Sequence, residues 1–490
     1  MPSTASSNGE DSPLLTSRTS SHPIADHEDH EVDDEDYLKD DDDKDREATE
    51  RSLLRKLDLR MSFLIILDIL NYVDRTNAAA ARLRGFEGDL GLEGKQFSSV
   101  LSVYYTSYIL MQIPSNMLFS QTSRPSLYLG CALMAPGIVT FGTGLVTTYH
   151  QALLARFLLG FTEAPFYIGA IFFLGRWYKR SELSTRMVYL ISGGLISVAF
   201  GTLIASFLLD IMDGVLGLPA WNWLFFIEGG LTTVAGTAAM FILPDLPETK
   251  SISWLSPAEH TLARKRMFED RSDTVSLPTD ARLGFTLAVL DWKTWYLATA
   301  IFLETLSTSF VIFFPTLTAT MGFSPTITLI LCAPPWLVAA ASSFWLSNHS
   351  DRTQERCMHV VIPFMVAMSG LLLSMVTMNS AARYLSLFLM TQGSASEVIL
   401  YTWASSTVGD PPAKRAVALA LITTISQSAN IAGSYVWVTE WGPTYTKSFA
   451  ICTRGVEKTE SSNGSRGRKT GVAAISEKKL EISHLTISTE

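Results

Sequence analysis

Apolar stretches of about twenty residues alternate with short polar loops through most of this chain. A helix needs roughly twenty residues to cross the ~30 Å hydrocarbon core of a bilayer, and only helices or closed barrels satisfy their backbone groups there. The pattern therefore predicts an all-α membrane protein. The eleven predicted spans are 61–81, 97–119, 127–147, 152–175, 187–209, 222–243, 294–319, 325–346, 358–378, 383–404 and 416–438.

The longest polar gap between spans follows the sixth and divides the chain into two halves. Residues 256–270 within this gap have the pattern of an amphipathic helix, with Pro257 in its first turn. We expect a disordered acidic cytoplasmic tail, a six-helix half, a cytoplasmic central loop, a second half with five spans and a polar C-terminal tail. The bounds of these segments are 1–50, 51–243, 244–293, 294–438 and 439–490.

Lysine and arginine in the short loops indicate the orientation, because cytoplasmic loops carry more of them. With the N-terminus inside, nine of these residues fall in inner loops and five in outer loops. An odd number of spans then places the basic segment 439–490 outside, against that rule. We therefore expect a twelve-span design whose twelfth helix, due to begin near residues 445–451, is missing because the C-terminal sequence is truncated or mis-spliced. A genuine eleven-span protein is the alternative.

The composition fits a membrane protein with a separate acidic tail. Hydrophobic residues make up 47% of the 490 residues, charged residues 17%, and the mean hydropathy is +0.22, which is too apolar for one soluble globule. Residues 1–50 carry 17 acidic and four basic side chains and too few aromatic residues to form a core. The run from Asp40 to Lys44 resembles an epitope-tag cleavage site, although composition favours a natural acidic tail.

Charged residues within membrane spans are the main functional candidates, because each is costly in lipid. Arg156 and Glu163 lie seven residues apart in the fourth predicted span, hence on one helical face, and Gly160 between them leaves room for a helix or a substrate. We expect Arg156 to attract an anionic substrate and Glu163 to carry a coupled proton. A static charge pair between helices is the alternative.

Five further residues of the first half are candidates. Asp74 and Arg75 are adjacent near one end of the first span and are predicted to form a gate or a second charge pair, although snorkelling or an internal ion pair would also explain them. Glu228 in the sixth span is predicted to support proton coupling. Tyr105 and Tyr167 are predicted to line the substrate cavity, although tyrosine stripes also serve helix packing.

The short loop between the eighth and ninth predicted spans contains Asp351, Arg352 and Arg356. An aspartate at a helix end can cap the helix, and arginines can hold neighbouring helices together. These three residues are therefore predicted to act as a gating latch. In the alternative interpretation the arginines only set the membrane topology.

The sequence contains no pattern that predicts catalysis. None of the eight histidines lies in the middle of a span, and no Walker-type glycine loop occurs. We therefore expect no enzyme activity, no cofactor, no metal ion and no direct use of ATP. The expected surroundings are the lipid bilayer, and no nucleic-acid partner is expected.

An ordered set of short motifs carries more specific information. They are Asn71-Tyr-Val-Asp74-Arg75-Thr-Asn77, Gln112-Ile-Pro114-Ser115-Asn116, Arg156-Phe-Leu-Leu-Gly160-Phe-Thr-Glu163-Ala164, Arg176-Trp177-Tyr178, Trp223-Leu-Phe-Phe-Ile-Glu228-Gly229, Pro244-Asp245-x-Pro247 and Lys414-Arg415-Ala416. With Asp351-Arg352-xxx-Arg356, they resemble the major facilitator superfamily over about residues 55–450 and, within it, the fungal anion:cation symporters of the allantoate permease type. The loop after the second span departs from the superfamily signature, since it keeps little beyond Arg124.

The resemblance implies the major facilitator fold, two six-helix halves around a central site, here with the twelfth helix missing. It implies a monomeric symporter in the fungal plasma membrane that imports a small organic anion with protons. A carboxylate vitamin, an allantoate-like nitrogen source and a small peptide are the expected kinds of cargo. The alternative is a non-transporting nutrient receptor or an inactive truncated paralogue.

Overall fold

The computed structural model describes residues 43–454, apart from gaps at 121, 123, 248–251, 253, 273–280, 354 and 409–411. Within these residues the chain forms helices and connecting loops, and no strand. Most of the two predicted tails lies outside the described residues. Residues 43–50, which we expected to belong to the disordered tail, instead form the first turns of a helix, because ion pairs described below hold them.

The two halves are built from long helices joined by short loops. The first half contains α1 (Asp43–Arg82), α2 (Phe86–Asp89), α3 (Gln96–Ser120), α4 (Pro125–Thr143), α5 (Tyr149–Trp177), α6 (Arg180–Ile211) and α7 (Ala220–Ile242). The helix α8 (Pro257–Ser272) lies in the central loop. The second half contains α9 (Ala281–Leu290), α10 (Trp292–Ser307), α11 (Phe314–Ala319), α12 (Pro325–Thr353), α13 (Cys357–Val376), α14 (Ser380–Thr391), α15 (Gly393–Thr407) and α16 (Pro412–Gly433).

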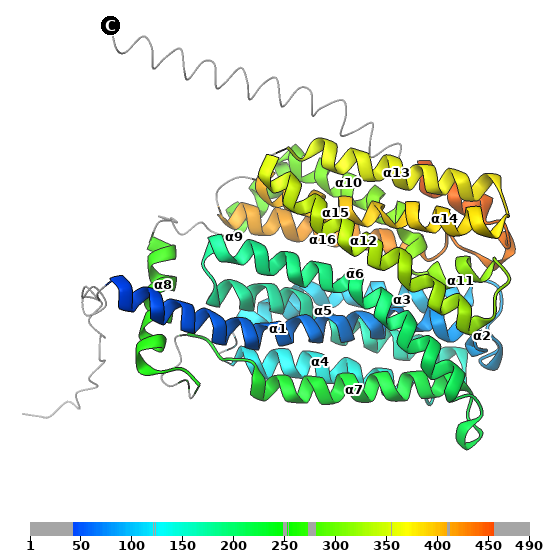
Figure 1. Cartoon of the computed structure of the whole chain (residues 1–490), viewed down its shortest axis with the longest axis horizontal. Coiled ribbons are helices and arrows are strands. Elements are labelled where there is room, and N and C mark those ends of the chain that lie inside the picture. The colour runs from blue at the N-terminus through cyan, green and yellow to red at the C-terminus, as the bar shows by residue number, and fades with distance from the viewer. Residues whose placement is uncertain are drawn as a thin grey trace, which may run out of the picture.

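The halves lie side by side, and their long helices run along the long axis of the molecule (Figure 1). Helix contacts join the halves: α6 packs against α12, α3 packs against α16, and α1 touches α11. At one end α8 packs against the start of α1, and α2 lies at the other end. We call these the α8 end and the α2 end.

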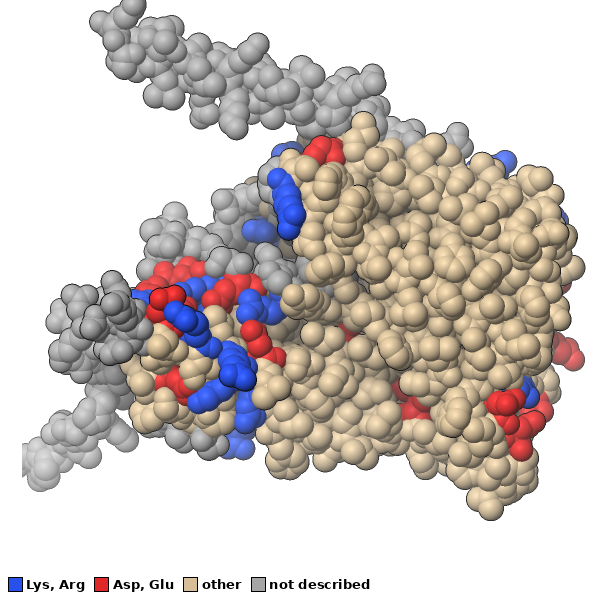
Figure 2. Space-filling view, viewed as in Figure 1, with Lys and Arg blue, Asp and Glu red and all other residues tan. Residues whose placement is uncertain are grey.

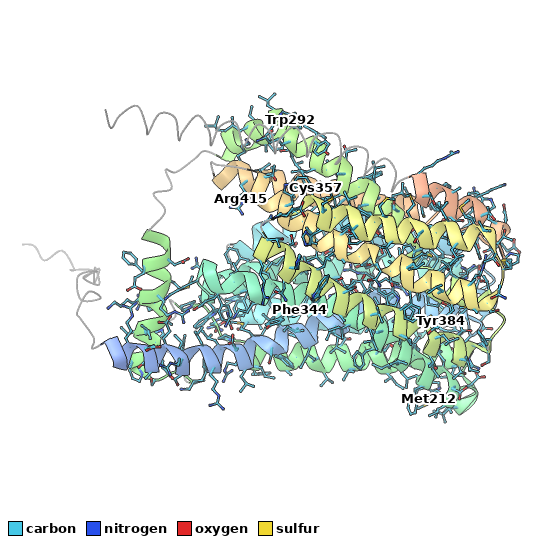
Figure 3. The ribbon with its side chains drawn as sticks, turned by 45° about the horizontal axis from the view of Figure 1, so that its top comes forward. Met212, Trp292, Phe344, Cys357, Tyr384 and Arg415 are labelled. Carbon is cyan, nitrogen blue, oxygen red and sulfur yellow. The ribbon has the colours of Figure 1, made fainter. Side chains whose placement is uncertain are left out.

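Successive spans of the second half run in opposite directions. In Figure 3, Trp292, Cys357 and Arg415 mark the starts of α10, α13 and α16 near one end, whereas Tyr384, at the start of α14, lies toward the other. Met212, which follows α6, also lies toward the α2 end. The alternation is that of a chain crossing a layer repeatedly.

Six helical segments of the described chain are long and apolar enough to cross a membrane. They are Pro125–Thr143, Tyr149–Trp177, Ser192–Ile211, Ala220–Ile242, Pro325–Ser350 and Cys357–Val376. The other predicted spans correspond to α1, α3, α10 with α11, α14 with α15, and α16, so the count of eleven stays a prediction. Residues 446–454 are also helical, where a twelfth span is expected to begin, and Cys452 Sγ lies 3.9 Å from the Leu306 carbonyl oxygen of α10.

The seventh predicted span, 294–319, is broken rather than continuous. It forms α10, a short 3-10 turn at Ser309–Val311 and then α11. Pro315 lies in the first turn of α11, where a proline is tolerated because that turn has no helical partner for its N–H. The break turns a group of aromatic side chains toward the space between the halves.

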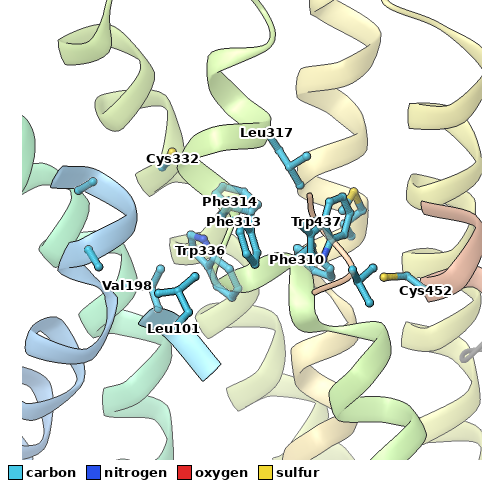
Figure 4. Close-up of a cluster of buried hydrophobic side chains, with 14 of the residues drawn as sticks. Leu101, Val198, Phe310, Phe313, Phe314, Leu317, Cys332, Trp336, Trp437 and Cys452 are labelled. Carbon is cyan, nitrogen blue, oxygen red and sulfur yellow. The ribbon is translucent and has the colours of Figure 1, made fainter. Parts of the chain in front are cut away.

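These aromatic residues form an apolar cluster near the α2 end (Figure 4). The ring of Phe314 lies 5.3 Å from Trp336 of α12, and the ring of Phe313 lies 6.4 Å from Trp437. Phe313 also faces Phe97 of the first half at 6.5 Å. Because the cluster contains side chains from both halves, it contributes apolar contact that holds them together at this end.

Hydrogen bonds also join the halves at the α2 end. Arg84 Nη2 donates to Asp210 Oδ1 at 3.0 Å and to Thr326 Oγ1 at 2.8 Å, and the Thr326 hydroxyl donates to Asp210 Oδ1 at 2.8 Å. Arg82 Nη2 donates to Thr439 Oγ1 at 2.8 Å. Since Arg82, Arg84 and Asp210 belong to the first half and both threonines to the second, the structure is closed at this end.

Charged side chains gather at the α8 end, beside a broad face with few charges (Figure 2). Arg266 of α8 is buried and lies 3.0 Å from Glu50 of α1 and 2.6 Å from Glu182 of α6. Arg46 of α1 lies 2.6 Å from Glu269 of α8. These ion pairs hold α8 and the start of α1 as one structure, which explains why residues 43–50 are helical.

Glu259 is the most strongly held carboxylate at the α8 end. Burial alone would raise its pKa, but hydrogen bonds from Lys56, from the Ser256 backbone N–H and from Ser52 lower the pKa to about 2. Ser256 and Glu259 form a capping box, in which each side chain accepts from the backbone N–H of the other. A helix, α8, is thus present at the position predicted for one in the central loop, and it packs against α1.

Candidate functional site

A partly buried arginine surrounded by tyrosines lies within the first half. Arg75 Nη2 of α1 lies 3.5 Å from Glu163 Oε2 of α5, and the Tyr104 hydroxyl of α3 donates to the same carboxylate oxygen. The guanidinium carbon of Arg75 lies 5.2–5.4 Å from the ring centroids of Tyr72, Tyr104 and Tyr108. The Glu163 side chain is fully buried, whereas the Arg75 side chain keeps 20% exposure. Arg75 is therefore a held cation with a free side, suited to attract an anion.

A second arginine, which is buried, connects three helices of the same half. Arg156 of α5 is 2% exposed, and its Nη2 donates to Asn77 Oδ1 of α1 at 3.1 Å. The Asn77 amide in turn donates to Glu228 Oε2 of α7 at 3.0 Å. This chain of contacts places positive and negative groups on facing helices, away from lipid.

Arg156 and Glu163 lie on one face of α5, but their side chains do not bind each other. Seven residues of α-helix rise about 10 Å, so the two side chains share a face without touching. Each instead binds a residue of α1, Asn77 for Arg156 and Arg75 for Glu163. A charge pair between helices, which was the alternative interpretation of Arg156 and Glu163, is formed instead by Arg75 and Glu163.

Asp74 and Arg75 do not bind each other either. Adjacent residues of a helix point about 100° apart, and Arg75 turns toward Glu163. The electrostatic neighbours of Asp74 are Glu228, Glu163 and Arg156. Asp74 and Arg75 therefore do not form the charge pair predicted as one alternative, since Arg75 pairs with Glu163, and the gating role of Asp74 and Arg75 stays a prediction.

Gly160 brings α5 against α3. A Cβ atom at this position would lie 2.1 Å from the Tyr104 carbonyl oxygen and 2.4 Å from Ser107 Oγ, so any side chain would force the helices apart. The predicted close approach at Gly160 is confirmed, and its occupant is a helix. This contact lets Tyr104 reach the Glu163 carboxylate.

Several polar atoms of this region have no hydrogen-bond partner among the described residues. They are both carboxylate oxygens of Asp74, one oxygen each of Glu163 and Glu228, and the Arg156 Nε. A buried polar atom without a partner costs about 1–3 kcal/mol, and charged groups cost more. Such atoms gather at sites that exchange protons, water or ligands.

A small cavity adjoins this network. Its volume is about 20 Å³, room for one water molecule, and Asn77, Thr202 and Glu228 are among its polar lining residues. Phe314 and Pro315 of the second half close its other side. The cavity therefore lies between the halves, on the α2 side of the charged network.

The two tyrosines predicted to bind substrate differ in their surroundings. Tyr105 is 7% exposed and packs edge-on against Tyr104 at 5.0 Å. Tyr167 lies one turn beyond Glu163 on α5 and has Glu397 of α15 among its electrostatic neighbours. Tyr167 packs against residues of the first half but lies within electrostatic reach of Glu397, whereas Tyr105 packs against Tyr104 of the first half.

The predicted latch residues lie at the α8 end. Arg352 is exposed in the last turn of α12, and Arg356 is the residue at which α13 begins. The side chain of Asp351 lies outside the described part of the structure. Their gating role stays a prediction.

The sequence reasoning missed two features that the structure shows. Asn77 belongs to a quoted motif, but nothing in the sequence indicated that it bridges Arg156 and Glu228. The sequence also did not indicate that Arg84 contacts Asp210 and Thr326, beyond showing that charged residues lie near the ends of the spans.

Among the described residues, no group of three or more histidine, cysteine, aspartate or glutamate side chains could hold a metal ion.

Comparison with known protein families identifies the family of this helical bundle. The family model of the Major Facilitator Superfamily matches residues 64–434. The chain belongs to the major facilitator superfamily. It is therefore a multi-pass membrane protein and a secondary transporter rather than an enzyme.

Individual proteins support this assignment. The chain is 30% identical over 419 residues to the MFS-type transporter cnsO of Penicillium expansum, covering 82% of this chain and 80% of that protein. It is 26% identical over 387 residues to a putative tartrate transporter of Agrobacterium vitis, covering 78% and 83%. A crystal structure of a bacterial homolog of the human lysosomal transporter Spinster, inward-facing and unoccupied, has the same fold, with a TM-score of 0.62 at 16% identity over 83% of this chain and 95% of that one.

Proposed function

We propose that this superfamily member imports a small organic anion together with protons across the fungal plasma membrane, as an allantoate permease-type symporter. The observation that carries the proposal is the presence of two arginines inside the helix bundle, Arg156 buried and Arg75 partly buried. A cation that is desolvated and held by fixed partners attracts an anion more strongly than a hydrated one. The putative tartrate transporter among the relatives is named for an anionic cargo.

Proton coupling is assigned to Glu163, with Glu228 in support. Glu163 shares its carboxylate between Arg75 and Tyr104, so an anion that competes for Arg75 weakens the interaction that keeps Glu163 ionised. Protonation of Glu163 releases Arg75 for the anion, and loss of the proton restores the ion pair. Binding of substrate and binding of H⁺ therefore favour each other.

The closed α2 end supports a proposal for the state of the transport cycle. The loop charges place the N-terminus, and with it the α8 end, in the cytoplasm. The bonds from Arg84 to Asp210 and Thr326 then close the extracellular side, as in the inward-facing and occluded states of alternating access. Opening at the α2 end would expose the small cavity beside Glu228 first.

Uptake by permease-deficient yeast tests the proposal. Labelled allantoate, nicotinate, biotin and a dipeptide are supplied at acidic and at neutral pH, and accumulation favoured at acidic pH supports symport. Arg156→Ala is expected to abolish uptake at an unchanged level of protein in the plasma membrane. Undiminished uptake by this variant removes Arg156 from the mechanism, and ligand-specific thermal stabilisation without flux would identify a receptor instead.

A further inference from the structure

Two glutamates of the second half lie in its membrane spans without cationic partners. Glu304 is near the end of α10, is 0% exposed, and both of its carboxylate oxygens lack a hydrogen-bond partner among the described residues. Glu397 lies in α15, which packs against α10, and the two carboxyl groups are electrostatic neighbours. The pair belongs to neither charged network of the first half.

The groups around the pair are neutral. Tyr401, one turn from Glu397 on α15, shares a hydrogen bond of 2.9 Å with Ser426 of α16. The Thr305 hydroxyl beside Glu304 donates to the Ile301 carbonyl oxygen at 2.9 Å.

Two tyrosines of the first half, Tyr72 of α1 and Tyr167 of α5, have Glu397 among their electrostatic neighbours. Glu397 thus faces the first half, with Glu304 behind it.

Two basic residues of the second half bind groups away from this pair. Arg383 of α14 binds Thr320 and the carbonyl oxygens of Pro443 and Thr444. Lys414 of α16 lies 2.7 Å from Asp291, at the start of α10. No cation among the described residues is an electrostatic neighbour of Glu304 or of Glu397.

Two ionised carboxylates are unstable in such a place. The buried Glu304 charge loses several kcal/mol of hydration, the partly buried Glu397 charge loses part of its hydration, and two like charges close together repel one another. Carboxyl pairs of this kind bind a proton cooperatively, and the proton belongs to the pair rather than to one residue.

We propose that Glu304 and Glu397 bind one proton between them at neutral pH, forming a proton site in the second half that is separate from Glu163. The proton adds to one carboxylate oxygen, and the pair then carries a single negative charge. The site exists whether or not the chain transports. Its role in coupling rests on the proposed symport, because Glu397 faces the space through which the substrate passes.

Infrared spectroscopy of the purified full-length chain tests the site without a substrate. A protonated carboxyl group has a carbonyl stretch well separated from the carboxylate bands. The wild type is expected to show this band at neutral pH, and both Glu304→Gln and Glu397→Gln are expected to remove or shift one component of it in the difference spectrum against the wild type. Glu355→Gln, a change in the loop before α13, is the matched control and should leave the band unchanged.

Each other outcome overturns the proposal. A band unaffected by both substitutions excludes the pair as the protonated group, and a band altered by only one substitution excludes a shared proton. Absence of the band, with sodium-dependent stabilisation that both substitutions abolish, would assign the pair to a metal cation. Size-exclusion chromatography identifies a variant that fails to fold. The infrared band of the variant that does fold then tests the proposal.

A transport measurement places the site in the cycle. In proteoliposomes, Glu304→Gln and Glu397→Gln are expected to lose accumulation driven by a pH gradient, at least tenfold, while exchange of labelled for unlabelled substrate persists. Unchanged accumulation removes the pair from coupling. If the wild type moves no substrate, the proposed function fails, whereas the infrared result on the proton site still stands.

Discussion

Arg75 and Glu163 form an ion pair that joins α1 to α5, with Arg75 Nη2 3.5 Å from Glu163 Oε2. The Glu163 side chain is fully buried and the Arg75 side chain is mostly so. Attraction in this place is strong only while both charges are present, since either alone would be an uncompensated charge in a medium of low dielectric constant. The pair is thus a structural element in addition to its proposed part in anion binding.

We predict that neutralising both members of this pair costs less stability than neutralising one. Arg75→Gln and Glu163→Gln are each expected to cost roughly 3–5 kcal/mol, because each leaves a buried charge unpaired. The double variant is expected to regain most of this loss but no uptake. Thermal unfolding in detergent measures the cycle, and a double variant that loses the sum of the two single effects would contradict the ion pair.

We predict that Gly160→Ala disrupts the contact of α5 with α3. The added methyl group would lie 2.1 Å from the Tyr104 carbonyl oxygen, so the helices must separate, at a cost of about 1–3 kcal/mol. Gly230→Ala on α7 is the matched control, because nothing lies within 4 Å of a Cβ atom there. Equal melting temperatures for the two variants would show that the approach at Gly160 is not as close as described.

We predict that Arg84→Ala opens the α2 end. Loss of its bonds to Asp210 and Thr326 removes roughly 1 kcal/mol from the closed state, because the Asp210 side chain is 57% exposed, and this shifts the equilibrium about fivefold. A cysteine placed at Ala205, which is buried and lines the small cavity, should then react faster with an external maleimide. The exposed Cys131 is replaced by serine in every variant.

Glu93→Gln provides the control for this labelling. Glu93 is exposed at the same end of the molecule, and its side chain is not used in the bonds that join the halves. In the Glu93→Gln variant, the cysteine introduced at position 205 should react with the maleimide at the same rate as in the protein without this substitution. A rate unchanged by Arg84→Ala would mean that the apolar cluster alone keeps this end closed.

We predict that acid loosens α8 from α1 through Glu259. Because the folded-state pKa of Glu259 is about 2, below its ordinary value of 4.5, its contribution is complete above about pH 4.5 and declines as the pH falls toward 2. Glu259→Gln removes the contribution at neutral pH, at roughly 1–3 kcal/mol. Hydrogen exchange of the α8 amides measures the loosening.

Glu269→Gln is the comparison for α8. Its carboxylate also binds an arginine of α1, Arg46, but the side chain is 40% exposed, and exposed ion pairs contribute only about 0–1 kcal/mol. The amides of α8 should therefore exchange faster in Glu259→Gln than in Glu269→Gln. The reverse order would show that the capping box is not the main attachment.

The local sequence determined where the spans lie. The predicted span 222–243 is α7, Ala220–Ile242, and the predicted span 358–378 is α13, Cys357–Val376. Apolar length is a property of neighbouring residues, since every helix must satisfy its own backbone in lipid whatever packs beside it. The close approach at Gly160 was predictable for the same reason, because a missing side chain is visible in one helix.

The tertiary structure alone decided which charges meet. Arg75 and Glu163 are 88 residues apart, and Asn77 and Glu228 are 151 apart, so spacing on one helix could not identify either contact. The sequence indicated that Arg156 and Glu163 share a face of α5, but not that α1 supplies a separate partner for each. Such contacts depend on how helix faces are rotated against one another, which side-chain packing between distant segments sets and no local periodicity records.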